Sequence, residues 1–295
     1  MASHPIPPHR TCGTAEVHHR LLERRLYQQH RIDIELFTAR FQYFGGADRR
    51  TGVTVIPTAV HVLYKDDAAN ISDAQIQSQM DVLNFDFRGA NADIARVPEV
   101  WKGLTGDARV EFKLEAVTRT RTDVNAFTTD DGMKATATGG IDPHPTDTYL
   151  NIWVCELSGG LLGYAQFPGG PPETDGVVVW HRAFGTSGTA AAPFNAGRTA
   201  THEVGHWLNL FHIWGDRLDC QGTDQVADTP GQQAPNYGKP VFPRISCNNG
   251  PHGDMFMNYM DYVDDEAMYM FTQGQVVRMQ AALDGPRSSI GRTPT

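Results

Sequence analysis

The sequence lacks three features that would assign it to a simple class: a long apolar run, an excess of positive charge and paired cysteine motifs. No stretch approaches the roughly 18 consecutive apolar residues of a membrane-spanning helix. The formal net charge of -9 at pH 7 argues against a nucleic-acid or anionic-membrane partner. With 40% hydrophobic residues in 295, the chain can still bury a core, so we expect a globular protein.

Only four cysteines are present, and no two of them form a C-x-x-C zinc pattern. Cys220 and Cys247 bracket a segment rich in Gly, Pro, Asn and Asp, where a disulfide would restrict the unfolded chain. We expect this bridge and, with it, an extracellular location. The alternative is two unrelated thiols. Cys155 ends an apolar run, and we expect it to be a small buried core residue.

The chemistry of the chain is concentrated in residues 202–212, HEVGHWLNLFH. Positions i and i+4 of an α-helix share one face, so His202 and His206 can each offer a ring nitrogen to one metal ion. Glu203 lies beside them and can take a proton from a metal-bound water. His212 reaches the same ion only if the helix ends soon after His206. The spacing predicts a catalytic zinc site with three ligands and an open position, rather than a helix with unrelated histidines.

The segments around this motif predict an α+β fold. Residues 14–41 are charged and helix-prone, and the glycine-rich stretch 45–52, with Arg49 and Arg50, is typical of an exposed linker that can be cut. Regular structure should be sparse from the metal-binding helix to residue 257. The other expected elements are strands at 53–64, 109–116, 149–155 and 176–180, a helix from the N-cap Ser72 to about Phe87, the metal-binding helix at 196–208, and a last helix at 272–283.

Residues 158–167 contain glycines that suit an edge strand, where a peptide substrate can add itself to the sheet. Leu162, Gly163 and Tyr164 are the residues that we expect to bind such a peptide. An ordinary surface loop is the alternative.

Residues 202–212 match the zinc signature of metzincin peptidases, and the surrounding sequence resembles the pappalysin family within that group, close to ulilysin. The resemblance covers essentially the whole chain. It implies that residues 258–262 form the Met-turn, with Met260 as an apolar floor below the zinc and Tyr262 near the metal as a stabiliser of the oxyanion. Asn209 replaces the usual glycine, and we expect a positive φ there because Asn tolerates it best.

The resemblance also implies a prosegment at 1–50. Residues 10–14, RTCGT, resemble a cysteine switch, in which Cys12 holds the zinc as a thiolate and excludes the catalytic water. The alternative is a free terminal thiol. The catalytic domain would follow at 51–295, with a mixed twisted sheet and helices in its N-terminal subdomain (51–208) and an irregular C-terminal subdomain (209–295) with a closing helix.

Two further sites follow from the resemblance. Asp265, which with Asp264 comes directly after the Met-turn, would lie in the pocket for the residue after the scissile bond and select Arg or Lys. A solvated acidic face is the alternative. Residues 222–230 resemble a calcium-binding loop with Asp224 and Thr229 as ligands, and a plain turn is the alternative.

The expected function is a secreted zinc endopeptidase, made as a zymogen that its own prosegment inhibits. Glu203 would take the proton from the attacking water and later give it to the leaving amine, while Tyr262 and zinc stabilise the oxyanion. Its substrates would be proteins or peptides. The competing hypothesis is a non-catalytic binding protein held together by zinc and calcium. The intact Glu203 and the open fourth metal position argue against it.

Overall fold

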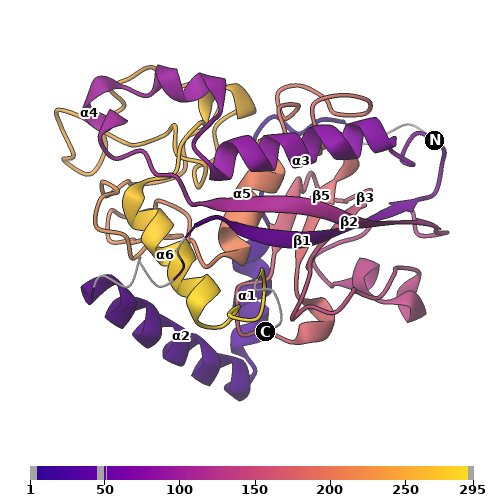
Figure 1. Cartoon of the computed structure of the whole chain (residues 1–295). Coiled ribbons are helices and arrows are strands. Elements are labelled where there is room, and N and C mark those ends of the chain that lie inside the picture. The colour runs from indigo at the N-terminus through magenta and orange to yellow at the C-terminus, as the bar shows by residue number, and fades with distance from the viewer. Residues whose placement is uncertain (1–4, 45–49, 51, 292–295) are drawn as a thin grey trace.

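A five-stranded twisted sheet runs through the centre of the molecule (Figure 1). The structure is a computed structural model that describes residues 5–44, 50 and 52–291. The strand order is β2-β1-β3-β5-β4, in which β4 is antiparallel to β5 and the other neighbours are parallel, so the predicted mixed sheet is confirmed. The strands are β1 (Thr54–Tyr64), β2 (Val110–Arg121), β3 (Leu150–Cys155), β4 (Gly163–Ala165) and β5 (Val177–Trp180).

Apolar residues explain why β3 and β5 lie inside the sheet. Every residue of both strands is buried, including Cys155 as predicted, because parallel strands are covered on both faces. The edge strand β2 instead alternates in exposure along most of its length. It continues past the predicted end at residue 116, because residues 117–121 keep pairing with β1. The other edge is β4, with three residues.

Helices α3 and α5 contact each other and cover one face of the sheet. Helix α3 begins as predicted, since Ser72 Oγ accepts a hydrogen bond from the backbone nitrogen of Gln75 at 3.2 Å. The helices are α1 (Thr14–Leu22), α2 (Arg25–Tyr43), α3 (Asp73–Phe87), α4 (Glu99–Lys102), α5 (Arg198–Trp207) and α6 (Gln273–Asp284). Short 3-10 helices occur at Ala92–Arg96, Gly132–Lys134, Thr136–Thr138, Pro172–Thr174, His181–Ala183 and Asp265–Ala267.

Loops and turns form most of the chain between α5 and α6, as the sequence predicts. Cys220 and Cys247 are joined by a disulfide within this region, with their Cα atoms 5.4 Å apart, which confirms the expected bridge. The closing helix α6 starts with a capping box, in which Thr272 and Gln275 each bind the other's backbone nitrogen. The irregular C-terminal half is therefore closed by one well-capped helix.

The N-terminal segment forms two helices rather than one. The chain breaks between α1 and α2 at residues 23–24, where Arg24 is extended. Helix α1 contacts the edge strand β4, and α2 lies alongside α6 (Figure 1). The two helices thus contact different elements, α1 the edge strand of the sheet and α2 the closing helix α6.

The expectation of an exposed linker is wrong at Arg50. This residue is buried, because the end of α6 and the chain after it fold over it: its Nε lies 3.2 Å from Asp284 Oδ1, and its Nη1 donates to the carbonyl of Ile290 at 3.0 Å. Of the other residues of the predicted linker, only Gly52 is among the described residues, and Arg49 lies outside them. Among the described helices, none has the length and apolar character needed to cross a membrane.

Candidate metal centre

Three histidine rings converge at the end of helix α5. The Nε2 atom of His206 lies 3.1 Å from that of His202 and 3.0 Å from that of His212, and the third pair is 3.3 Å apart. A tetrahedral zinc ion with Zn–N bonds of about 2.0 Å needs ligand nitrogens about 3.3 Å apart. The three predicted ligands therefore fit one zinc ion.

A left-handed turn delivers the third histidine. Helix α5 ends at Trp207, and Asn209 has φ 73°, the positive value that the sequence predicts for it. The backbone nitrogen of Leu210 then donates to the carbonyl of Gly205 at 2.9 Å, which reverses the chain. The carbonyl of Asn209 accepts a hydrogen bond from Arg278 Nε at 2.6 Å, so helix α6 holds the turn in place.

The other nitrogen of each ring faces a hydrogen-bond acceptor. The acceptors are the carbonyl of Tyr259 for His202 at 2.7 Å, the carbonyl of Leu210 for His206 at 2.7 Å, and Asp216 Oδ1 for His212 at 2.5 Å. Protons on the three Nδ1 atoms leave each Nε2 lone pair for a metal. Burial lowers the pKa of His202 and His206 well below its usual value, which also favours neutral rings.

Asp216 is a functional residue that sequence reasoning missed. Its only sequence signal is its position four residues after His212, in a loop where no helical pattern gives that spacing a meaning. Burial acts to raise the pKa of Asp216, but its interactions with His212 and His206 outweigh burial and lower the pKa below the usual value. The ionised carboxylate orients the ring of His212 toward the other two.

Cys12 supplies a fourth candidate ligand atom. Its Sγ and one nitrogen of each of the three histidines all lie within 4.8 Å of one another. Burial and the neighbouring Glu203 raise the pKa of the thiol among the protein groups alone, whereas a zinc ion would favour the thiolate. The predicted switch cysteine therefore lies at the metal centre and not on a free terminus.

Glu203 is buried beside this cluster. Its Oε2 accepts a hydrogen bond from Cys12 Sγ at 3.3 Å and from Thr14 Oγ1 at 3.0 Å. The pKa of Glu203 is raised to about 8, because burial outweighs the opposing effect of these two hydrogen bonds. A carboxyl group with a raised pKa is suited to exchange protons near neutral pH.

The N-terminal segment adds itself to the edge of the sheet. Gly13 donates its backbone N–H to the carbonyl of Gly163 at 3.0 Å, and Leu162 donates to the carbonyl of Thr11 at 3.2 Å. A Cβ atom at Gly163 would come within 3.1 Å of the side chain of Glu203, so a glycine allows this close approach. The predicted edge at Leu162 and Gly163 thus binds a peptide segment through its backbone.

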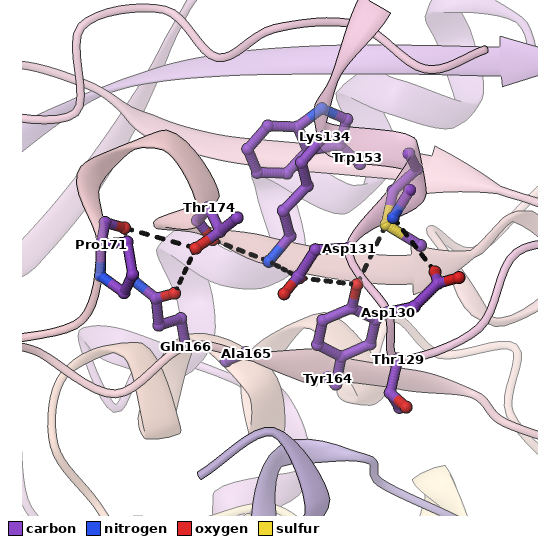
Figure 2. A network of polar contacts seen from close by, with 12 residues as sticks. Thr129, Asp130, Asp131, Lys134, Trp153, Tyr164, Ala165, Gln166, Pro171 and Thr174 are labelled. Carbon is purple, nitrogen blue, oxygen red and sulfur yellow. Dashed lines mark hydrogen bonds and ion pairs between the residues drawn. The ribbon is translucent and has the colours of Figure 1, made fainter. Parts of the chain in front are cut away.

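The side chain of Tyr164, the third residue predicted to bind a peptide, lies away from the metal centre. Its buried side chain points to the far side of β4, where the hydroxyl lies 3.0 Å from Asp131 Oδ1 (Figure 2). Successive side chains of a strand alternate between its faces, so Tyr164 faces away from the side on which Gly163 approaches Glu203. The Tyr164 side chain therefore supports the strand from behind, and any contact of Tyr164 with a peptide would be through its backbone.

The Met-turn lies directly against helix α5. Met260 is fully buried, and a Cβ atom at Gly205 would be only 2.6 Å from its sulfur, so the helix needs a glycine there. The ring of Tyr262 lies 4.9 Å from that of His212, and its hydroxyl is 3.5 Å from the carbonyl of Cys12. Met260 thus lies against the helix that carries two of the histidines, and Tyr262 lies beside the third.

Asp265 is buried, and not part of a solvated acidic face. Its Oδ1 forms an ion pair with Arg10 at 2.5 Å, and its Oδ2 accepts a hydrogen bond from the backbone nitrogen of Ala196 at 2.7 Å. Arg10 also donates to Thr199 Oγ1 at 2.8 Å. Sequence reasoning did not single out Arg10, because its partner is 255 residues away.

Asp224 and Thr229 meet in the loop after α5. The Thr229 hydroxyl lies 2.9 Å from both carboxylate oxygens of Asp224 and 3.0 Å from the carbonyl of Val226. Burial raises the pKa of Asp224 to about 7, although the hydrogen bonds from Thr229 and the backbone of Val226 oppose the shift. Oxygen atoms at these separations fit neighbouring ligands of a calcium ion with bonds of about 2.4 Å.

Known proteins resemble the chain along most of its length. Residues 142–284 match the peptidase family M43, described as pregnancy-associated plasma protein-A. Extracellular metalloproteases of Arthroderma otae and Arthroderma benhamiae are 36% and 37% identical to it, over 80% and 79% of this chain and 80% and 78% of theirs. The chain belongs to the pappalysin family of metalloendopeptidases.

Two solved pappalysin structures share this architecture. A variant of promirolysin from Tannerella forsythia is 44% identical, with a TM-score of 0.87 over 95% of this chain and 96% of that one. Mature mirolysin in complex with a cleaved peptide is 49% identical, with a TM-score of 0.80 over 81% of this chain and 96% of that one. The α+β fold with a prosegment is therefore confirmed, and membership in this metalloprotease family supports zinc at the three histidines.

Proposed function

We propose that this pappalysin is a secreted zinc endopeptidase, made as a zymogen, that prefers Arg or Lys after the scissile bond. The observation that carries the proposal is the convergence of three Nε2 atoms and Cys12 Sγ, with Glu203 beside them. Secretion is supported by relatives that are named extracellular metalloproteases and by the disulfide between Cys220 and Cys247.

Glu203 and Tyr262 have separate roles beside the metal position in this proposal. When bound, zinc would polarise the scissile carbonyl and make a water more acidic. Glu203 Oε2, freed from Cys12 and Thr14, takes a proton from the attacking water and passes it to the leaving amine. The Tyr262 hydroxyl, freed from the carbonyl of Cys12, donates to the developing oxyanion.

Latency comes from a prosegment that occupies the parts needed by a substrate. Cys12 takes the open metal position, residues 11–13 take the free edge of β4, and Arg10 takes Asp265. Mature mirolysin matches 81% of the chain and promirolysin 95%, a difference (95 − 81) of 14%. That share supports a prosegment at 1–50 and a catalytic domain at 51–295, divided into 51–208 and 209–295.

Arg10 indicates what the Asp265 pocket accepts. Its guanidinium group makes the ion pair with Asp265 and lies over the ring of Phe194, 5.2 Å from the centroid. A buried carboxylate without a cation is strongly unfavourable, so a substrate that replaces the prosegment has to supply one. This favours Arg or Lys directly after the scissile bond.

Asp224, Thr229 and the carbonyl of Val226 would hold a structural calcium ion in the loop after α5. A buried carboxylate with a raised pKa gains from a nearby cation, and the loop has little regular structure of its own. Calcium here would stabilise the chain segment that continues from His212.

The first prediction concerns Glu203. In the full chain cut at the linker by trypsin, Glu203→Ala should retain zinc but lower peptide cleavage by about 10²–10⁴-fold, because the general base is lost. Zinc is measured by atomic absorption, and cleavage with peptides carrying Arg or Gln after the scissile bond. The exposed Glu173→Gln serves as control. Undiminished cleavage by Glu203→Ala contradicts the mechanism, and no cleavage by the native chain favours a binding protein.

The second prediction concerns Arg10. Arg10→Gln leaves Asp265 buried without a cation, which weakens the docked prosegment by about 3 kcal/mol. Peptidase activity and the processed fragment should then appear at least about tenfold earlier during incubation of the full chain. Glu23→Gln changes an exposed charge on the same segment and should not alter the onset. An onset equal to that of the native chain argues against the role of Arg10.

The third prediction concerns calcium. Removal of calcium with a selective chelator should lower the melting temperature of the full chain by about 5 °C, and added calcium should restore it. Asp224→Asn should abolish this response, whereas Asp219→Asn, an exposed neighbour, should keep it. If the melting temperature of the native chain is the same with and without calcium, the site is ruled out.

A further inference from the structure

A buried lysine stands behind the edge strand β4 (Figure 2). The Nζ atom of Lys134 lies 2.7 Å from Asp131 Oδ1 and donates to the carbonyl of Thr174 at 2.7 Å. The rings of Tyr164 and Trp153 lie 4.8 Å and 5.4 Å from the same nitrogen. Lys134 and the hydroxyl of Tyr164 thus both hold one oxygen of Asp131, and the carboxylate has a fixed direction.

The second oxygen of Asp131 faces the prosegment. Arg20, in helix α1, donates from one guanidinium nitrogen to Asp131 Oδ2 at 2.7 Å and from another to the carbonyl of Thr129. The hydroxyl of Thr129 in turn donates to Glu16 Oε1 at 2.8 Å. The prosegment therefore binds this loop through a guanidinium group that meets two acceptors.

The order of contacts along the prosegment places this loop relative to the metal. Arg10 reaches Asp265, Cys12 reaches the metal centre, and Arg20 then reaches Asp131. Between the last two, Thr14 Oγ1 accepts a hydrogen bond from the backbone nitrogen of Ala165 in β4. Along the prosegment, the contact with Asp265 thus comes before the metal-binding Cys12, and the contact with Asp131 comes after it.

We infer that Asp131 Oδ2 and the carbonyl of Thr129 form a second specificity subsite, which accepts an arginine of the substrate on the N-terminal side of the scissile bond. The inference rests on the proposed function, in which Asp265 takes the residue after that bond. Departure of the prosegment removes Arg20 from both acceptors, and the donors on Asp131 Oδ1 keep the carboxylate in place.

Arginine suits this subsite better than lysine. The buried Lys134 offsets the negative charge of Asp131, so that recognition depends on directed hydrogen bonds more than on net charge. A guanidinium group offers donors in a planar fork that can meet the carboxylate and the carbonyl together, whereas an ammonium group is a point charge. The expected order of preference is Arg, then Lys, then neutral side chains.

The test uses the full chain after cleavage of the linker by trypsin. Peptides keep Arg after the scissile bond and carry Arg, Lys or the neutral isostere citrulline at each of the four preceding positions. At one position, kcat/KM should be about tenfold higher for Arg than for citrulline. This ratio should fall to about one in the double variant Asp131→Asn, Lys134→Met. The second substitution is included so that Lys134 is not left as an unpaired buried charge.

Asp130→Asn is the matched control, since Asp130 is an exposed neighbour whose carboxylate accepts the backbone N–H of Gly132 at 3.1 Å. It should keep the tenfold ratio. No preference for Arg at any of the four positions, or a preference that survives in the Asp131→Asn, Lys134→Met chain, overturns the subsite.

A binding measurement separates the failure of this subsite from the failure of the proposed function. A synthetic peptide of residues 10–22 is titrated into the cut Glu203→Ala chain, with either Arg or citrulline at position 20. The Arg peptide should bind about tenfold more tightly. If no peptide is cleaved but this difference holds, the subsite stands and the protease function falls. Equal binding of the two peptides overturns the subsite.

Discussion

Three neutral imidazoles that face one buried point are the constraint on which the rest of the structure depends. Their Nε2 lone pairs lie 3.0–3.3 Å apart, an arrangement that is unfavourable unless a cation lies among them. The surrounding elements hold the rings in this arrangement. Tyr259 and Leu210 fix two rings through carbonyls, Asp216 fixes the third, and Asn209 supplies the turn that brings His212 back.

The same constraint explains two glycines of the centre. Met260 lies directly against Gly205 of α5, and the strand at Gly163 comes close to Glu203. Any side chain at either position would separate elements that the metal centre needs side by side. The N-terminal segment then closes the site as a substrate-like occupant. Its Cys12 reaches the metal position, and arginines on either side of it reach Asp265 and Asp131.

Local patterns predicted much of this arrangement. The i, i+4 pair on α5, the cap at Ser72 and the left-handed Asn209 each depend on near neighbours in the chain, and the structure contains all three. The pairings that set specificity join residues far apart. Arg10 and Asp265 are 255 positions apart, and Arg20 and Asp131 are 111 apart, so no local rule could join them. Strand alternation places Tyr164 opposite Gly163, but only the fold decides which face meets the metal centre.

X-ray absorption at the zinc edge tests the central claim most directly, because it reports the atoms bound to the metal before and after activation. The intact chain should show three nitrogen ligands and one sulfur at about 2.3 Å, the distance of a zinc–thiolate bond. After cleavage of the linker and removal of the prosegment, the sulfur should be replaced by oxygen while the three nitrogens remain. An intact chain without a sulfur ligand would contradict the account.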